Sequence, residues 1–352
     1  MTTSSAASTS NPVQRVHSAL FPTAAPTTLH ALPSLAAELG VKALYVKDES
    51  ARYGLPAFKI LGASYALASV LGRRWGVEPW DVAALRERAA KDQVTVFAAT
   101  DGNHGRATAH TARLLGLPAH IYVPRTVEPW SVKAIESEGC PVTQVDADYD
   151  GAVRAAADAA EAAHGLLIQD MSWEDYVDIP ELITQGYMTI LSEADAQLPP
   201  GVQATAVIVP VGVGSLAHAV VQWYHGGVSG PALSTSPNVR ILSAEPEAAP
   251  CLHTSLANGA PTPVETSFTI MPGLNCGTVN PEAWPDLQRV IRPADALVVT
   301  DDEARAEVAA LGGLGVPAGP CGAASLAAAR KASLGKEDVL VLICTEGVAG
   351  SA

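Results

Sequence analysis

One lysine of this 352-residue chain has the surroundings that favour covalent amine chemistry. Lys59 is flanked by Phe58 and Ile60 at the head of an alanine-rich segment with a helical pattern, so we expect its amine to be partly removed from water. Burial disfavours the charged form of an amine and lowers its pKa, which leaves more of the neutral form that attacks a carbonyl carbon. Lys59 is therefore a candidate Schiff-base nucleophile. Taken alone, the same pattern also fits a surface lysine whose stem lies along apolar residues.

A polar segment, residues 100–105 (Thr-Asp-Gly-Asn-His-Gly), follows an apolar stretch that ends near residue 99. Its glycines allow backbone N–H groups to approach a ligand, and a helix beginning there favours an anion. Asp101 is a candidate acid or base, and Asn103 offers a donor and an acceptor to a ring oxygen. His104 has no second metal ligand at a helical spacing, so we expect no metal. An Asx turn that caps a helix explains the segment equally well.

A glycine-rich segment, residues 211–217, follows another apolar stretch. Its backbone amides and the hydroxyl of Ser215, at the start of a helix, form an anion site suited to phosphate. Gly212, Gly214 and Ala217 also fit the glycine pattern of dinucleotide-binding proteins. That pattern requires an acidic residue about 20 positions later, and here Glu245 follows too late. A nucleotide-binding module therefore remains the alternative of a different class.

Cys344 lies at the end of the last apolar stretch, in residues 342–347. A buried structural thiol is the simplest interpretation of this residue. The chain has five cysteines, an odd number, which are dispersed and include no Cys-x-x-Cys pair. Neither a disulfide framework nor a zinc site is therefore predicted.

These segments must be positioned by the alternating apolar and helical stretches around them. Several of the apolar stretches show no polar alternation, which is typical of strands buried on both faces of a parallel sheet. Residues 216–223 are predicted to form an amphipathic helix capped by Ser215, and residues 106–115 a helix ended by Gly116. In such α/β proteins, ligands bind at the carboxyl ends of the strands. The predicted strands are residues 43–46, 94–98, 120–123, 141–145, 166–169, 206–209, 240–244, 296–299 and 339–343.

Composition limits the classes of function. With 22 basic and 36 acidic residues the formal charge is −14, and no basic run occurs, which argues against nucleic acid or an anionic membrane as a partner. We therefore expect a small-molecule substrate. No apolar run approaches the roughly 18 residues that cross a bilayer. The polar N-terminus has neither the charged nor the apolar region of a signal peptide, so we expect a disordered tail and a cytoplasmic protein.

Taken together and in order, these segments resemble the fold-type-II pyridoxal-phosphate (PLP) enzymes. That family includes threonine and serine dehydratases, cysteine synthase and the β subunit of tryptophan synthase, and the resemblance is greatest to diaminopropionate ammonia-lyases. An ordered series of this kind is more specific than any single motif. The matching segments are residues 47–50, 57–59, 101–105, 169–170, 173–174, 185–187, 212–215, 273–278 and 345–347.

The resemblance implies a role for each matching residue. Lys59 would bind PLP through a Schiff base, and Asn103 would hydrogen-bond the 3′-oxygen of the cofactor. Cys344 occupies the position where relatives carry a serine or cysteine that faces the pyridine nitrogen. Asp101 and Asp170 match the acid and base aspartates of the ammonia-lyases. The cofactor phosphate would be held by the backbone amides of Gly212, Val213, Gly214 and Ser215.

The implied reaction is α,β-elimination from a β-substituted amino acid, above all conversion of 2,3-diaminopropionate to pyruvate and ammonia. Lys59 and Asp101, on opposite faces of the substrate, would allow both enantiomers to lose the α proton. The thiol of Cys344 is a weak partner for the ring nitrogen, which favours elimination over transamination. An extra carboxylate also suits a β-ammonium substrate. The alternatives are dehydration of serine, threonine or 3-hydroxyaspartate, and β-replacement, on the same fold.

The implied fold is two open, twisted α/β domains with the cofactor in the cleft between them. We expect a tail at 1–12, a large PLP-binding domain at 13–62 and 166–352, a small α/β domain at 63–165, and a homodimer. Two departures from the family stand out. Residues 318–323 read Ala-Gly-Pro-Cys-Gly-Ala where relatives read Ser-Gly-Glu-Ser-Gly-Ala, so Pro320 and Cys321 replace an acidic side chain near the cofactor. The sequence also ends five residues after Gly347, whereas the ammonia-lyases continue.

Overall fold

A computed structural model of the chain describes residues 11–100, 102–228, 230–236 and 238–348. The strands are β1 (Leu29–Ala31), β2 (Ala43–Asp48), β3 (Val96–Ala99), β4 (Ala119–Pro124), β5 (Val142–Val145), β6 (Leu166–Leu167), β7 (Ala206–Pro210), β8 (Arg240–Pro246), β9 (Ala296–Val299) and β10 (Val339–Cys344). The α-helices are α1 (Pro12–Leu20), α2 (Pro33–Leu39), α3 (Lys59–Trp75), α4 (Val82–Asp92), α5 (Asn103–Leu115), α6 (Pro129–Glu136), α7 (Tyr149–Ala162), α8 (Asp178–Gln197), α9 (Ser215–His225), α10 (Cys251–Asn258), α11 (Trp284–Val290), α12 (Asp301–Gly313) and α13 (Pro320–Lys331). Two 3-10 helices are η1 (Pro272–Leu274) and η2 (Pro293–Asp295).

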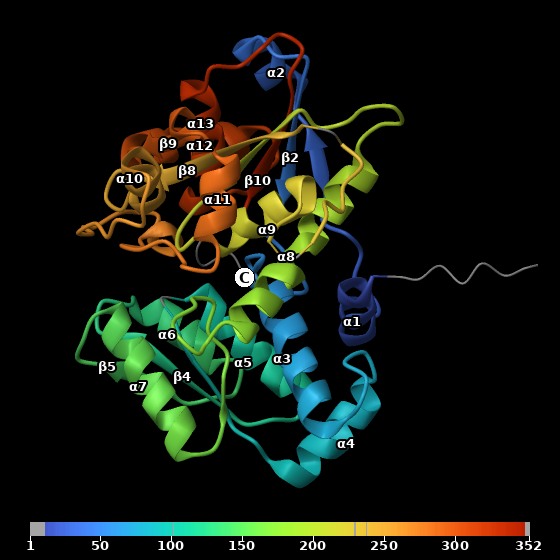
Figure 1. Cartoon of the computed structure of the whole chain (residues 1–352), viewed down its shortest axis with the longest axis vertical. Coiled ribbons are helices and arrows are strands. Elements are labelled where there is room, and N and C mark those ends of the chain that lie inside the picture. The colour runs from blue at the N-terminus through green and yellow to red at the C-terminus, as the bar shows by residue number, and fades with distance from the viewer. Residues whose placement is uncertain (1–10, 101, 229, 237, 349–352) are drawn as a thin grey trace, which may run out of the picture.

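The strands form two sheets, which lie in the upper and lower halves of Figure 1. The six-stranded sheet has the order β1-β2-β10-β7-β8-β9, and the four-stranded sheet has the order β5-β4-β3-β6. Every pairing is parallel except that of β1 with β2. All nine predicted strands are present, so the predicted α/β class with parallel sheets is confirmed. The three-residue strand β1 was missed because it is too short to show a pattern.

The side chains of β10 show why the central strands read as continuous apolar runs. Leu340 and Leu342 pack into a core shared with α2, α12 and α13, whereas Val341 and Ile343 pack into the core that includes α3, α8 and α9. Successive side chains of a strand point to opposite faces, so a strand covered by helices on both faces must be apolar throughout. The core that contains Val341 and Ile343 also includes residues of the four-stranded sheet and therefore joins the two sheets.

Helices α3 and α8 pack closely between the two sheets (Figure 1). A Cβ atom added to Gly186 would lie 2.5 Å from the backbone oxygen of Leu61, and one added to Gly62 would lie 2.5 Å from Cε1 of Tyr187. Side chains larger than hydrogen would therefore push the helices apart. This contact fixes the first turn of α3, where Lys59 lies, against α8.

The structure confirms the predicted end of α5 but not the predicted cap of α9. Helix α5 ends at Gly116 in the left-handed conformation (φ 76°), as predicted, but it begins at Asn103 rather than near residue 106. The predicted cap of α9 is wrong, because Gly214 is the capping residue and Ser215 is the first residue of the helix. The hydroxyl of Ser215 instead donates to the backbone oxygen of Asp170, 2.8 Å away.

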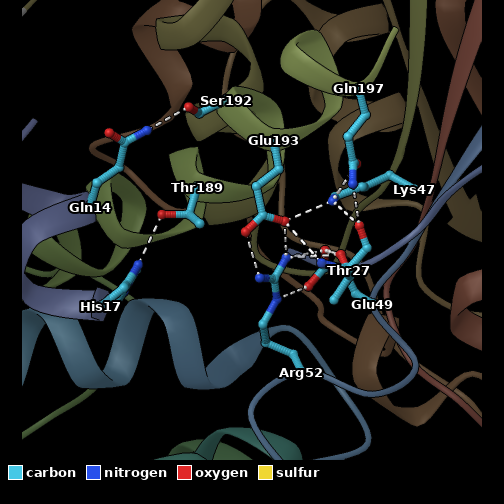
Figure 2. A network of polar contacts seen from close by, with 10 residues as sticks. All are labelled: Gln14, His17, Thr27, Lys47, Glu49, Arg52, Thr189, Ser192, Glu193 and Gln197. Atoms are coloured by element: carbon cyan, nitrogen blue, oxygen red, sulfur yellow. Dashed lines mark hydrogen bonds and ion pairs between the residues drawn. The ribbon is translucent and has the colours of Figure 1, made fainter. Parts of the chain in front are cut away.

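A buried ionic cluster lies where β2, the loop around Thr27 and α8 meet (Figure 2). Lys47 Nζ lies 2.7 Å from Glu193 Oε2, and Arg52 lies 2.7 Å from both Glu49 Oε1 and Glu193 Oε2. The side chains of Lys47 and Arg52 are fully buried. Lys59 is therefore not the only lysine of the described chain with a buried setting, and Lys47 is likewise paired with a carboxylate.

Of the predicted tail at 1–12, residues 1–10 lie outside the described residues, and Asn11 caps helix α1. The division at 62/63 and 165/166 stays a prediction. None of the helices in the described residues combines the length and the apolar composition that a membrane crossing requires.

Candidate active site

Lys59 and Asp170 are brought together at the junction of the two sheets. Lys59 is the first residue of α3, and its Nζ lies 2.6 Å from Oδ2 of Asp170, which follows β6. The side chains are only 20% and 6% exposed. Two residues that the sequence singled out separately therefore form a nearly buried ammonium–carboxylate pair.

The carboxylate of Asp170 reverses the direction of the pKa shift that the sequence predicted for Lys59. Burial alone would lower that pKa, as the sequence suggested, but attraction to the carboxylate of Asp170 outweighs burial and raises it above the ordinary range. Burial would in turn raise the pKa of Asp170, and the nearby charge of Lys59 holds it well below the ordinary range. The expectation of a lowered lysine pKa is therefore wrong for this structure, because a local pattern cannot show the partner across the cleft.

Four helices begin at this place. The first residues of α3, α5, α9 and α13 are Lys59, Asn103, Ser215 and Pro320, and the N-cap residue of each helix makes no side-chain cap hydrogen bond. Uncapped N–H groups and the helix dipole give each N-terminus a partial positive charge that favours anions. The arrangement can therefore hold a multiply charged anionic group.

Hydrogen bonds link these helix starts in two pairs. Ser215 Oγ donates to the backbone oxygen of Asp170, which joins α9 to the Lys59 pair. Asn103 Nδ2 donates to Glu346 Oε2 at 2.8 Å, and the backbone N–H of Cys321 donates to Glu346 Oε1 at 3.4 Å. Glu346 thus joins α5 to α13. Burial raises the pKa of Glu346 above its ordinary value.

The glycine segment before α9 is shaped for close approach of its backbone. Gly214 adopts φ 103°, which side chains rarely adopt. A Cβ atom on Gly212 would lie 2.9 Å from the backbone oxygen of Gly273 and 3.1 Å from Sγ of Cys276. The glycine cradle, Gly212, Val213, Gly214 and Ser215, therefore has no room for a side chain at Gly212, which fits a phosphate site made of backbone amides.

Cys344 is the last residue of β10 and is fully buried. Its Sγ donates to the backbone oxygen of Glu346 at 3.4 Å, and burial raises the pKa of the thiol well above its ordinary value. The residue therefore carries a neutral thiol close to Glu346. Its predicted role toward a pyridine nitrogen stays a prediction beside the structural role that this contact supports.

Two residues near Lys59 were not predicted as site residues. His104 is buried, with Nε2 2.8 Å from the backbone oxygen of Ile168 and Nδ1 3.9 Å from Oδ2 of Asp170. The ring of Tyr187 lies with its centre 5.9 Å from Lys59 Nζ. Both belong to segments that carried the family resemblance, so the signal was present although no role was assigned. Asp101, in contrast, lies outside the described residues.

Comparison with known proteins identifies the family. The family model "Pyridoxal-phosphate dependent enzyme" matches residues 20–346, nearly the whole chain. This chain belongs to the pyridoxal-phosphate dependent enzymes. The diaminopropionate ammonia-lyase of Escherichia coli K12 is 36% identical over an alignment of 353 residues, which covers 92% of this chain and 84% of the relative. The L-threonine ammonia-lyase of Geobacter sulfurreducens is 29% identical over 266 residues, which cover 76% of this chain and 56% of that relative.

A solved structure of this PLP-dependent family extends the likeness to three dimensions. The Escherichia coli diaminopropionate ammonia-lyase in complex with an aminoacrylate-PLP azomethine reaction intermediate superposes with a TM-score of 0.83 at 32% identity, covering 96% of this chain and 88% of that chain. The predicted fold type II is confirmed. PLP as cofactor is also confirmed, and with it the nucleotide-binding alternative is set aside.

The residues present in this PLP-dependent enzyme fit the cofactor. A phosphate group matches the uncapped start of α9 and the glycine cradle before it. An aldehyde requires a primary amine, which Lys59 supplies at the start of α3. The amide of Asn103 is oriented by Glu346 and can donate its second N–H to a ring oxygen.

Proposed function

We propose that this PLP-dependent enzyme catalyses α,β-elimination from a β-substituted amino acid, with 2,3-diaminopropionate as substrate and pyruvate and ammonia as products. The observation that carries the proposal is the Lys59–Asp170 pair, at 2.6 Å, beside the N-termini of α3, α5 and α9, which no N-cap side chain caps. The 36% identity to a diaminopropionate ammonia-lyase over most of both chains supports the choice of substrate.

We infer that Lys59, Asn103 and the amides of residues 212–215 hold PLP. When bound, the cofactor acts as the electron sink for the negative charge that remains at Cα after loss of the α proton. The chain supplies orientation around it. Glu346 accepts one N–H of Asn103 and so fixes which side of the amide faces the cleft. The hydroxyl of Ser215 donates to the backbone oxygen of Asp170. This hydrogen bond holds the proposed phosphate site and the proposed acid/base group in a fixed relative position.

Asp170 is proposed to transfer protons at the reaction centre. Its Oδ2 already accepts a hydrogen bond from Lys59 Nζ, so a proton can pass between an amine and this carboxylate without rearrangement of the backbone. Asp101 is proposed as the second acid or base. Burial strengthens the interaction of the Asp170 carboxylate with cationic groups.

The preference for a β-ammonium substrate follows from charge. Asp170 and Glu346 are acidic side chains close to Lys59, and no described basic side chain is hydrogen-bonded to Glu346. A substrate with a second ammonium group would gain attraction here that a hydroxyl group would not. We propose that this attraction selects diaminopropionate over serine.

The second candidate is a dehydratase for serine, threonine or 3-hydroxyaspartate, or a β-replacement enzyme. The 29% identity to an L-threonine ammonia-lyase supports keeping this alternative, because it shows that the same family accepts a hydroxyl leaving group. The leaving group, and not the fold, distinguishes the two candidates.

The test is a substrate panel with the purified holoenzyme. We expect an absorbance band of bound PLP, and ammonia release that is fastest with 2,3-diaminopropionate among diaminopropionate, serine, threonine and 3-hydroxyaspartate. Lys59→Ala should lose the band, and Asp101→Ser should shift the preference toward hydroxy substrates. Faster release from serine or threonine would establish the second candidate, and absence of bound PLP from the wild type would overturn both.

We also infer a homodimer located in the cytoplasm, with domains 13–62 plus 166–352 and 63–165. The sequence resemblance supports the dimer. Sedimentation equilibrium of the holoenzyme tests the dimer, cell fractionation tests the location, and limited proteolysis tests the domain division.

A further inference from the structure

His104 has one ring nitrogen that finds no hydrogen-bond partner among the described residues. The residue is 5% exposed, and its Nε2 lies 2.8 Å from the backbone oxygen of Ile168. A carbonyl oxygen only accepts, so Nε2 must carry the ring proton and Nδ1 must present a lone pair. Among the described residues, Nδ1 has no hydrogen-bond partner. An unsatisfied buried polar atom costs free energy, so its placement needs a reason.

A carboxylate oxygen of the active site lies near that nitrogen. Nδ1 lies 3.9 Å from Oδ2 of Asp170, and Oδ2 is the same oxygen that lies 2.6 Å from Lys59 Nζ. As long as Lys59 holds the proton, Nδ1 and Oδ2 are two acceptors with no hydrogen between them. If Oδ2 carries the proton, the same two atoms become a donor and an acceptor.

We propose that His104 is a positioning residue that makes Lys59 a neutral amine, by accepting a hydrogen bond from the protonated carboxyl of Asp170. The step is internal: one N–H bond of the Lys59 ammonium breaks, an O–H bond forms at Oδ2 of Asp170, and no proton leaves the protein. An ammonium, a carboxylate and a neutral imidazole become an amine, a carboxylic acid and the same neutral imidazole. This inference rests on the proposed function, in which Lys59 reacts as an amine.

The surrounding groups favour such an exchange. Burial lowers the pKa of His104, which keeps the ring neutral and able to accept. Burial raises the pKa of Tyr187, so its phenol keeps its proton. The described titratable groups that act on Lys59 include Asp170, Tyr187, Cys276, Glu346 and His104, and those that act on His104 are Asp170 and Lys59. Oδ2 must approach the ring by roughly 1 Å to reach hydrogen-bond distance, which rotation of the Asp170 side chain provides.

The experiment measures the reactivity of Lys59 in the apoenzyme. Pyridoxal 5′-phosphate is added to apoenzyme between about pH 7 and 9, where its phosphate stays a dianion, and the adduct is trapped with borohydride and assigned by peptide mass. An internal proton transfer makes the rate constant independent of pH, whereas release of the proton to solvent makes it rise about tenfold per pH unit. We expect a flat profile for the wild type.

His104→Gln is the informative variant, because its amide can still donate to the backbone oxygen of Ile168 but has no ring nitrogen at the position of Nδ1. We expect the rate constant for labelling of Lys59 to be about tenfold lower near pH 7, because about one buried hydrogen bond is lost. We also expect this rate constant to rise with pH. His17→Gln is the matched control, because His17 is also buried and contacts a backbone oxygen, that of Leu61, but not Asp170. The control should keep the flat profile.

The outcomes separate the inference from the proposed function. A wild-type profile that rises with pH, or a flat profile in folded His104→Gln, would overturn the role of His104 while leaving Lys59 as the reactive amine. Labelling that persists unchanged in Lys59→Ala would overturn the proposed function itself. Circular dichroism of each variant shows that it is folded.

Discussion

Lys59 Nζ and Asp170 Oδ2 lie 2.6 Å apart although the residues are 111 positions apart in the sequence. The pair joins the start of α3 to the segment after β6, and the hydroxyl of Ser215 holds the backbone of Asp170 from a third element. Because both side chains are largely buried, each fixes the charge of the other. The pair therefore sets the resting protonation of the active site as well as its geometry.

Asp170→Asn keeps the shape of the side chain and removes its charge. Without the carboxylate only burial remains, so the pKa of Lys59 should fall below that of the wild type. We expect kcat/KM for 2,3-diaminopropionate to fall by about 10²–10⁴, the usual contribution of a general acid or base. Asp286→Asn is the control, since Asp286 is also buried but pairs with His218. An equal loss in the control would indicate a general effect of removing a buried carboxylate.

Gly212→Ala tests the phosphate cradle. The new methyl group would lie 2.9 Å from the backbone oxygen of Gly273, so one of the two segments must shift. We expect at least about tenfold weaker binding of PLP, a loss of about 1.4 kcal/mol, in an absorbance titration of the apoenzyme. Gly312→Ala, in a helix with no atom within 4 Å of the added group, should bind PLP as the wild type does. Unchanged affinity in Gly212→Ala would place the phosphate elsewhere.

Arg52→Met tests the buried ionic cluster of Figure 2. The substitution leaves the fully buried Glu49 without its arginine, and removing one partner of a buried pair costs about 3–5 kcal/mol. We expect that loss in the free energy of unfolding by urea. Arg305→Met removes an exposed pair with Asp302 and should cost about 1 kcal/mol or less. Similar small losses in both variants would show that the cluster contributes little.

His17→Gln tests a pH dependence of stability. Burial lowers the pKa of His17 from its ordinary 6.5 to about 4, so the unfolded chain binds a proton first as the pH falls. Stability should therefore be complete above about pH 6.5 and be lost progressively toward pH 4, by on the order of 3 kcal/mol. His17→Gln should show a smaller loss over that range in urea unfolding. Parallel curves for the two proteins would contradict the neutral buried ring.

Much of the fold followed from local patterns. Central strands such as β7 and β10 lack polar alternation because helices cover both faces of their sheet, and α5 ends at Gly116 because glycine adopts the left-handed conformation. The short strand β1 could not be predicted, since three residues carry no period and the strand forms only by pairing with β2. Helix α9 begins at Ser215, one residue before the predicted start, because the Ser215 side chain bonds to Asp170 instead of capping the helix.

The sequence by itself determined the cofactor class, because its ordered series of segments resembles the PLP enzymes, and it predicted the residues that would bind PLP. Tertiary structure alone decided how those residues are charged. Asp170 reverses the pKa expected for Lys59, Glu346 orients Asn103, and Nδ1 of His104 lies 3.9 Å from Oδ2 of Asp170. Electrostatic interactions depend on distance in space and on burial, and neither quantity is encoded in spacing along the chain.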